Sequence, residues 1–275
     1  MFRNKDIGII ADKKLFIFDI DGTVCLSDKP TPGAVEFTDR LRADGKRILF
    51  FTNNSSCTDE FFLTRLRSAG FDVSLDEILT SADVAARFLL DRRAGASVFA
   101  VLPPQVTRSL ADRGVHISDG SSARADIVLS GFDTSLTYDK LRTACRYLSF
   151  GSEFFSTHRD LSCPTADGMV PDSGAVCAFL TAATGRTPVY LGKPDSVSAQ
   201  MIRSLSGLDW HDMCMFGDRL YTDIAFGNRH GMATVLLLTG EAAAKDAEQA
   251  DTLCRPDFVF KDLSELSRLM YDKRA

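Results

Sequence analysis

Four short apolar runs, far apart along the chain, each lead directly into polar residues, and they constrain the fold more than any other feature. The runs and the residues that follow them are 15–18 before Asp19, 48–51 before Thr52, 189–191 before Gly192, and 213–216 before Gly217. Short runs of this kind are typical of buried parallel strands. Open α/β sheets hold ligands just beyond the carboxyl ends of their strands. We therefore expect carboxylates, a hydroxyl and an ammonium group at one edge of one sheet.

The segments between these runs predict helices. Ala34, Phe37 and Leu41 recur at helical spacing, and Gly45 provides a stop. Further strands are expected at 233–238 and 258–260. Strands that alternate with helices indicate an α/β fold, in which a doubly wound parallel sheet is covered on both faces.

A stretch between the second and third runs carries none of the four motifs. It has strand candidates of its own at 98–102, 127–129 and 154–155, and an amphipathic helix over 141–148. Its length of roughly 110 residues is a plausible domain size. We predict a core formed by residues 1–80 and 189–275, with a second α/β domain of residues 81–188 inserted between them.

Composition excludes several classes of protein. The net charge of −5, with scattered basic residues, gives no reason to expect nucleic acid or an anionic membrane as partner. No apolar stretch approaches the ~20 residues of a membrane helix, and the N-terminus does not resemble a secretory signal. Seven cysteines without a Cys-x-x-Cys pair argue against disulfides and zinc. Reduced thiols in a cytoplasmic protein are the simplest expectation.

Asp19 and Asp21 follow the first run, two residues apart. A carboxylate held at the end of a buried strand can attack phosphorus and form an aspartyl phosphate. If the chain stays extended, Asp21 points to the same side and can give a proton to the departing oxygen. Gly22 permits a tight turn, and an ordinary surface Asp-Gly turn is the alternative. Cys25 lies close behind, where burial is its expected role and oxidation would be a means of silencing the site.

Two further motifs supply groups that suit a phosphate. Thr52, Asn53 and Asn54 offer a hydroxyl and loop N–H groups that can hold phosphate oxygens, whereas Ser55 and Ser56 after them could simply start the next helix. Lys193 follows the third run and a glycine, and Pro194 fixes the chain after it. An ammonium group there would neutralise the charge of a transferred group, whereas most lysines are merely solvated.

Asp218 and Asp223 follow the fourth run and suggest a metal site. Mg²⁺ prefers oxygen ligands, so we predict that Asp19, the backbone carbonyl of Asp21 and Asp218 bind it. Asp223 would act from an outer position or through water, or would simply belong to a helix start. Without a cation, carboxylates that converge on a phosphate would repel it by on the order of several kcal/mol.

These motifs, in this order, resemble the haloacid dehalogenase superfamily of Mg-dependent phosphohydrolases. The residues that carry the resemblance are Asp19-Ile20-Asp21-Gly22-Thr23, Thr52-Asn53-Asn54-Ser55, Gly192-Lys193-Pro194 and the stretch from Gly217-Asp218 to Asp223-Ile224. The chain is most similar to the NagD-type subfamily, which includes 4-nitrophenylphosphatases and phosphatases of phosphoglycolate, pyridoxal phosphate and nucleotides. The resemblance implies a Rossmann-like core with an inserted α/β cap domain of the C2 type.

The resemblance also implies a role for each motif. Asp19 would be the nucleophile, Asp21 the general acid and base, and Lys193 the charge stabiliser. Thr52 and Asn53 would bind phosphate. Asp19, Asp21 and Asp218 would bind the metal.

One segment departs from the family pattern. Where such caps have Thr-Asn-x-Asp, this chain has Thr157-His158-Arg159-Asp160. His158 and Arg159 could bind a polar or anionic leaving group, although Arg159 could equally be solvated. We therefore do not infer the natural substrate from any relative. It could be a nucleotide, a sugar phosphate, phosphoglycolate or pyridoxal phosphate.

We expect a cytoplasmic Mg²⁺-dependent phosphatase of small phosphorylated metabolites, with a homodimer through the cap as a further expectation. Two alternatives stay open. A phosphotransferase or mutase of the same superfamily would pass the phosphoryl group to a second hydroxyl. A non-catalytic phospho-ligand sensor, or a receiver-type domain, would keep its aspartyl phosphate, but receivers are about half this length and lack the late Gly-Asp motif.

Overall fold

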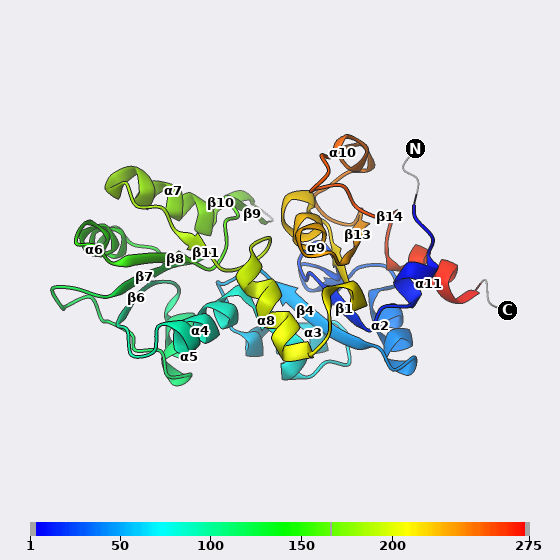
Figure 1. The fold of residues 1–275 in the computed structure, drawn as a ribbon, viewed down its shortest axis with the longest axis horizontal. Helices are drawn as coiled ribbons and strands as arrows, with labels where there is room; N and C mark the ends of the chain where they lie inside the picture. The colour runs from blue at the N-terminus through cyan, green and yellow to red at the C-terminus, as the bar shows by residue number, and fades with distance from the viewer. Residues whose placement is uncertain (1–3, 166, 273–275) are drawn as a thin grey trace. The chain divides into compact units, whose positions relative to one another are not determined.

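The computed structural model describes residues 4–165 and 167–272, which form two compact units (Figure 1). The first unit comprises Met1–Thr52, Glu60–Leu79 and Ala199–Ala275. The second comprises Asn53–Asp59 and Thr80–Ser198. These limits place residues 189–198 with the second unit, whereas the boundaries predicted from the sequence place them in the core.

The first unit contains a six-stranded sheet, which forms because both faces of its strands are apolar. In sheet order its strands are β14 (Phe258–Phe260), β13 (Ala233–Leu237), β12 (Met213–Gly217), β1 (Leu15–Phe18), β4 (Arg47–Thr52) and β5 (Ile78–Thr80). β1 pairs in parallel with β4 and with β12. Every residue of β1 and β12 is buried, as expected of strands covered on both sides. The chain leaves β1 toward β4 and returns later to β12 on the other side, so the strand order reverses at β1.

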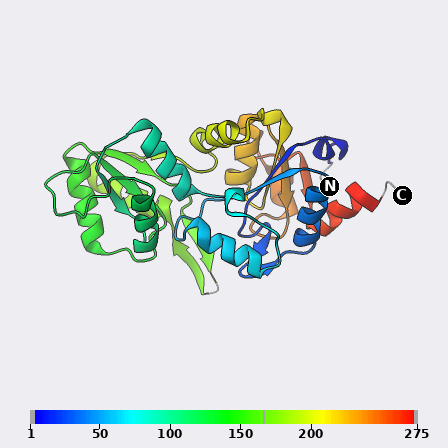
Figure 2. The same cartoon turned by 90° about the horizontal axis from the view of Figure 1, so that it is seen from below.

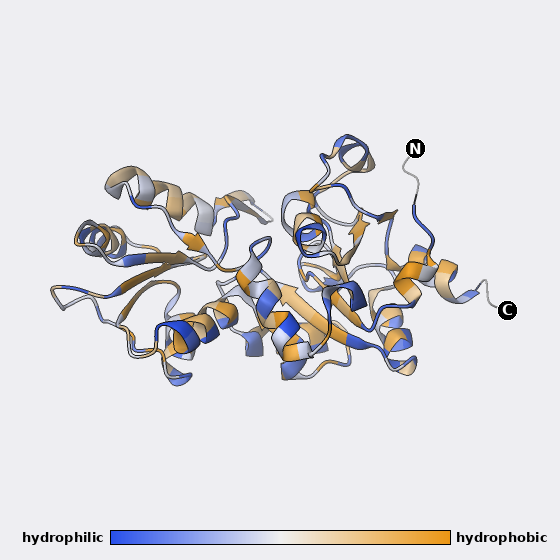
Figure 3. Cartoon of the chain, in the orientation of Figure 1, coloured by the Kyte–Doolittle hydropathy of each residue, from blue (hydrophilic) through white to orange (hydrophobic). Residues whose placement is uncertain are grey.

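Aromatic side chains fill the space between this sheet and α2 (Ala34–Ala43). The rings of Phe18 and Phe216 are tilted by 30° with centroids 4.6 Å apart, and Phe37 of α2 packs on both. Such pairs add stability beyond the area they bury. β4 is mainly hydrophobic along its length (Figure 3). The rigid packing fixes the carboxyl ends of β1 and β12 relative to each other.

The remaining elements of the first unit surround the sheet or connect its strands. They are α1 (Gly8–Ala11), the hairpin β2 (Cys25–Leu26) and β3 (Lys29–Pro30), α3 (Asp59–Ser68), the 3₁₀ turns Leu75–Glu77 and Trp210–Asp212, α8 (Ser196–Ser206), the π-helical turn Leu220–Ile224, α9 (Ala225–His230), α10 (Ala244–Gln249) and α11 (Leu263–Tyr271). The first residue of α3 and the first three residues of α8 belong to the second unit. No described helix is long and apolar enough to cross a membrane.

The second unit has a four-stranded parallel sheet in the order β11 (Val189–Tyr190), β8 (Glu153–Ser156), β7 (Ile127–Ser130) and β6 (Val98–Val101). Its helices are α4 (Ser81–Arg92), α5 (Pro104–Asp112), α6 (Tyr138–Ser149) and α7 (Ser173–Thr184). Tyr147, Leu148 and Leu180 are fully buried in its core. An antiparallel hairpin of β9 (Ser162–Thr165) and β10 (Gly168–Pro171) projects from this unit (Figure 2).

The expected α/β fold class, with a parallel sheet core and flanking helices, is confirmed. The expectation that all four apolar runs belong to one sheet is wrong for the third run. β11 pairs with β8 in the second unit, with Tyr190 opposite Ser156. This strand has only two residues, and Val189 is 52% exposed, so its pattern does not determine which sheet it joins.

Candidate active site

Three carboxylates meet at the carboxyl ends of β1 and β12. The N–H of Asp19 donates to the carbonyl of Phe216 at 2.9 Å, which extends the strand pairing by one residue. One carboxylate oxygen from each of Asp19, Asp218 and Asp223 lies within 4.8 Å of the other two. Asp218 and Asp223 are almost completely buried. The site therefore lies where the strand order reverses, which is the usual ligand position in an open α/β sheet.

The Asp218 carboxylate is held by groups from two segments. Thr23 Oγ1 lies 3.3 Å from Asp218 Oδ1, and the N–H of Glu241 donates to Oδ2 at 2.8 Å. Two glycines make room for it, because a Cβ atom at Gly22 or Gly240 would lie 2.4 or 2.0 Å from Oδ2. Gly22 also has a φ of +90°, which favours glycine. The Asp-Gly pair of the first motif is therefore required by packing as well as by the turn.

Charge repulsion marks this cluster as a cation site. Burial, together with the nearby Asp223 carboxylate, raises the pKa of Asp218 to about 6. Hydrogen bonding from Glu241 and the charge of Arg219 oppose this shift. Three oxygen donors at this separation match the preference of a hard divalent cation, whose charge would favour the ionised form. The donor set thus fits a magnesium ion.

The Asp21 carboxylate has a cationic partner. Arg65 of α3 donates from Nη2 to Asp21 Oδ1 at 2.7 Å and from Nε to the carbonyl of Ser27 at 3.1 Å. Nε also lies 3.5 Å from Asp28 Oδ1. The Arg65 side chain is 11% exposed and that of Asp21 is 41% exposed. Arg65 therefore fixes both Asp21 and the turn between β2 and β3, a contact that the sequence analysis missed.

Cys25 lies beside this ion pair but is not poised to react. Burial raises the pKa of its thiol to about 11, an effect that the Arg65 charge reduces and the Asp21 charge increases. A thiol in such surroundings forms little thiolate at neutral pH and oxidises slowly. Its role is the burial that the sequence predicts.

In the second motif, the Asn53 side chain bonds to residues distant in the sequence, whereas the Asn54 side chain bonds locally. Thr52 ends β4 and is 2% exposed. The Asn53 amide accepts from the N–H of Lys193 at 2.9 Å, and it donates to the Lys193 carbonyl and to Asp160 Oδ2, both at 3.1 Å. The Asn54 side chain accepts from the N–H of Ser56 at 2.9 Å, which forms the kind of local turn that precedes helices.

Lys193 is 1% exposed, which is rare for a lysine. It follows β11 in the second unit, where the N–H of Gly192 donates to the Thr157 carbonyl at 2.7 Å. The described contacts thus join Lys193, Asn53 and Asp160 in this unit, and Asp19, Asp218 and Asp223 in the first. That Lys193 and the carboxylates act on one phosphoryl group stays a prediction.

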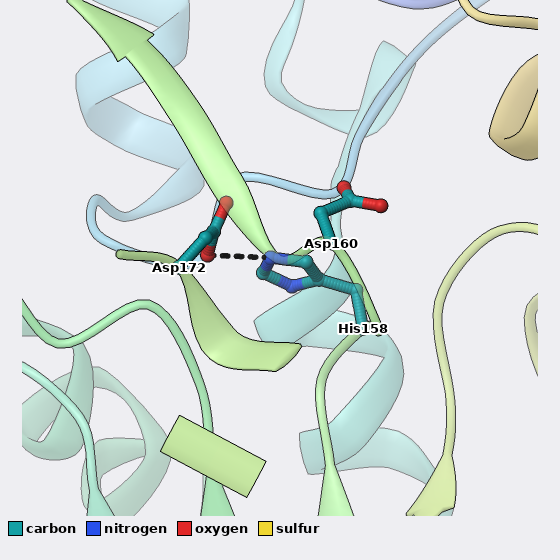
Figure 4. Close-up of side chains that lie close together, drawn as sticks. All are labelled: His158, Asp160 and Asp172. Carbon is teal, nitrogen blue, oxygen red and sulfur yellow. Dashed lines mark hydrogen bonds and ion pairs between the residues drawn. The ribbon is translucent and has the colours of Figure 1, made fainter. Parts of the chain in front are cut away.

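His158 is fully buried within a polar cluster of the second unit (Figure 4). Its Nε2 lies 2.9 Å from Asp172 Oδ1, and its Nδ1 lies 3.0 Å from Thr157 Oγ1. Asp172 also accepts from the N–H of Ser173 at the start of α7. Both ring nitrogens of His158 therefore have partners within the unit, and Asp172 is a partner that the sequence did not reveal.

Arg159, the neighbouring residue, is partly exposed. Its Nε and Nη2 contact the two carboxylate oxygens of Asp195 at 3.0 and 2.5 Å. The guanidinium also lies over the Tyr190 ring, 4.8 Å from its centroid. These contacts explain how Arg159 is oriented, and its binding of a leaving group stays a prediction.

Known proteins resemble this chain over nearly its whole length. A haloacid dehalogenase-like hydrolase model matches residues 16–116, and a second hydrolase model of this type matches residues 190–266. An acid sugar phosphatase from Staphylococcus aureus is 32% identical, with 92% of this chain and 96% of that protein covered. The chain belongs to the haloacid dehalogenase superfamily.

Solved structures support the same assignment. A 4-nitrophenylphosphatase from Thermotoga maritima superposes with a TM-score of 0.89 at 39% identity, covering 94% of this chain and 98% of that one. A glycerol phosphate phosphatase from Mycobacterium tuberculosis, solved with magnesium, has a TM-score of 0.86 at 30% identity and covers 94% and 77%. A further neighbour, at 37% identity, carries the NagD name. The predicted family and enzyme class are thereby confirmed.

Proposed function

We propose that this enzyme is a Mg²⁺-dependent phosphatase that hydrolyses small phosphomonoesters through an aspartyl phosphate. The observation that carries the proposal is the cluster of Asp19, Asp218 and Asp223 at the point where the strand order reverses. Asp19 would be the nucleophile, and the cluster, Asp19 included, would bind the cation that allows an anionic substrate to approach.

Magnesium would be held by Asp19, the backbone carbonyl of Asp21 and Asp218, with Asp223 in an outer position. When bound, it would neutralise phosphate charge and orient the phosphoryl group for in-line attack. The raised pKa of Asp218 supports a cation here, since a positive charge would offset the burial and the Asp223 charge that disfavour its ionised form.

Asp19 would attack phosphorus, forming an oxygen–phosphorus bond as the bond to the leaving oxygen breaks. Asp21 would give that oxygen its proton. In the second half of the reaction, Asp21 would take a proton from water, whose oxygen attacks phosphorus and releases inorganic phosphate from Asp19. The fixed position of Asp21 beside Arg65 supports a role that demands accurate placement.

The remaining motif residues would hold the phosphoryl group. The Thr52 hydroxyl and main-chain N–H groups of Asn53 and Asn54 would donate to its oxygens, and the Lys193 ammonium would balance its charge. His158 and Arg159 belong to the inserted domain, which would exclude water and limit substrate size. Small metabolites are therefore favoured over polymers as substrates.

Three wider expectations complete the proposal. A cytoplasmic location is proposed from the cysteines, because reduced thiols are the ordinary state of cysteines in that compartment. Nucleic acid and membranes are not expected as partners, because the net charge is −5. A homodimer through the inserted domain remains a prediction, which light scattering of the purified protein would test.

Turnover measurements test the proposal directly. The purified protein should hydrolyse 4-nitrophenyl phosphate over many turnovers with magnesium and lose this activity with EDTA. A panel of sugar phosphates, glycerol phosphate, nucleotides, phosphoglycolate and pyridoxal phosphate would then identify the substrate class. Transfer to an added alcohol in place of release of phosphate would indicate a phosphotransferase. A stable phosphoprotein without turnover would indicate a sensor and overturn the proposal.

A further inference from the structure

We propose that Asn53 is a positioning residue for Lys193, holding its main chain with a pair of hydrogen bonds while Asp160 fixes the orientation of the Asn53 amide. This inference rests on the proposed function, because it concerns the lysine that would balance the phosphoryl charge. It differs from the role that the resemblance implies for Asn53, which is direct binding of phosphate.

One side-chain amide binds both polar groups of a single residue. Asn53 Oδ1 accepts from the N–H of Lys193 at 2.9 Å, and Asn53 Nδ2 donates to the Lys193 carbonyl at 3.1 Å. The two residues are 140 positions apart in the sequence. Asn53 is 7% and Lys193 1% exposed, so water cannot readily replace these bonds. A buried polar group that loses its partner typically costs about 1–3 kcal/mol.

Asp160 determines which way the amide points. Its Oδ2 accepts from Asn53 Nδ2 at 3.1 Å, and Asp160 is 3% exposed. An ionised carboxylate only accepts hydrogen bonds, and the Lys193 N–H only donates. A flipped amide would set oxygen against oxygen and N–H against N–H. Only one orientation therefore satisfies all three contacts, and in it Lys193 has a single main-chain position.

The same arrangement leaves the Asn53 side chain with no donor for an anion. An asparagine amide has two N–H bonds. One is directed to the Lys193 carbonyl and the other to Asp160. A phosphate oxygen needs donors, so any contact from this residue to phosphate would come from its main chain. The geometry therefore separates a positioning role from a binding role.

The peptide before Lys193 is fixed independently. The N–H of Gly192 donates to the Thr157 carbonyl at 2.7 Å. A Cβ atom at Gly192 would lie 2.6 Å from that carbonyl oxygen and 2.7 Å from Asn53 Oδ1. Only glycine allows this approach, so the Gly192-Lys193 pair of the third motif is matched to Asn53 in space. Ser81 Oγ in turn donates to the Asn53 carbonyl at 2.5 Å.

A double-mutant cycle between Asn53→Ala and Lys193→Met tests the inference. If Asn53 acts through Lys193, Asn53→Ala alone should lower kcat about 10- to 100-fold with KM changed less than about threefold. Combined with Lys193→Met, it should lower kcat by less than about twofold further, because the group it positions is already gone. Losses that multiply in the double variant would show direct phosphate binding and overturn the inference.

Asn228→Ala is the matched control. The Asn228 amide also donates to two main-chain carbonyls, those of Leu253 and Arg255, both at 2.8 Å. Its loss should lower the melting temperature to a similar degree while kcat stays within about twofold of wild type. A comparable kcat loss in this control would mean that the Asn53 effect is only structural.

Asp160 supplies a second cycle should Asn53→Ala fail to fold. Asp160→Ala should lower kcat about 3- to 10-fold, and Asp160→Asn should restore most of it, because its side-chain oxygen still accepts from Asn53 Nδ2. Both effects should vanish in the Lys193→Met background. An inactive wild type would refute the proposed function itself, whereas an active wild type with multiplicative losses refutes only the positioning role.

Discussion

The buried polar groups of the two units differ in how their charges and hydrogen bonds are balanced. In the first, the carboxylates of Asp19, Asp218 and Asp223 lie close together, and burial together with the Asp223 charge raises the pKa of Asp218 to about 6. In the second, Asn53 and His158 have both ends of their side chains matched by partners of the opposite hydrogen-bonding type. The first arrangement is completed only by a cation, whereas the second is complete by itself. The repelling carboxylates therefore indicate where a cation and catalysis are expected, and the fully hydrogen-bonded side chains indicate where residues are held in position.

The largest expected effect is at the nucleophile. Asp19→Asn should reduce turnover of 4-nitrophenyl phosphate by more than about 10³-fold, since a neutral amide cannot form the aspartyl phosphate. Circular dichroism and the melting temperature should match those of wild type. Activity above a few per cent would contradict the covalent role of Asp19.

The metal prediction follows from the repulsion in the first unit. Folding raises the pKa of Asp218, so its carboxyl ionises less readily in the folded protein than in the unfolded chain. The free energy of unfolding is therefore highest at low pH and falls as pH rises from about 4 to about 6. Without metal at pH 7, Asp218→Asn should therefore be more stable than wild type by about 3 kcal/mol. Magnesium should raise the melting temperature of wild type and have little effect on the variant.

Denaturant titrations at pH 4 and pH 7, with and without EDTA, measure this. At pH 4 the two proteins should differ little, because Asp218 is then protonated when folded. If the metal-free wild type is more stable than Asp218→Asn at pH 7, the ionised Asp218 does not destabilise the folded protein, and the prediction is wrong.

Arg65 allows a test of whether the first unit also needs a fixed proton donor. Arg65→Met removes the guanidinium that holds Asp21, and should lower kcat/KM about tenfold more for glycerol phosphate than for 4-nitrophenyl phosphate. The nitrophenolate leaves with little help, whereas an alkoxide needs a proton. Arg67→Met is the control, because Arg67 donates from the same helix to the Val73 carbonyl. Equal losses on both substrates would exclude a link to proton donation.

The smallest effect is expected in the second unit at His158. His158→Asn should lower the free energy of unfolding by about 1–2 kcal/mol, because Asp172 loses a buried partner. KM for small substrates should stay within about twofold of wild type if the ring is only structural. A severalfold rise in KM would instead support its predicted contact with the leaving group.

Local pattern was sufficient for the parallel sheet and for the carboxylate cluster. Residues 15–18 and 213–216 are apolar on both faces, so they become neighbouring buried strands and bring Asp19 and Asp218 together. The same reasoning failed for residues 189–191, because a two-residue strand has too little side-chain pattern to choose between two sheets. The side-chain contacts of Asn53 could not be predicted, since their partners are more than 100 residues away.

By itself, the sequence determined the fold class, the family and the set of reactive groups, because each depends on short motifs next to apolar runs. Only the tertiary structure decided which side chains meet. Arg65 contacts Asp21, which lies 44 residues earlier in the sequence, and His158 contacts Asp172 at the start of α7. Such pairs depend on how whole elements pack, and packing is a property of the folded chain rather than of any segment.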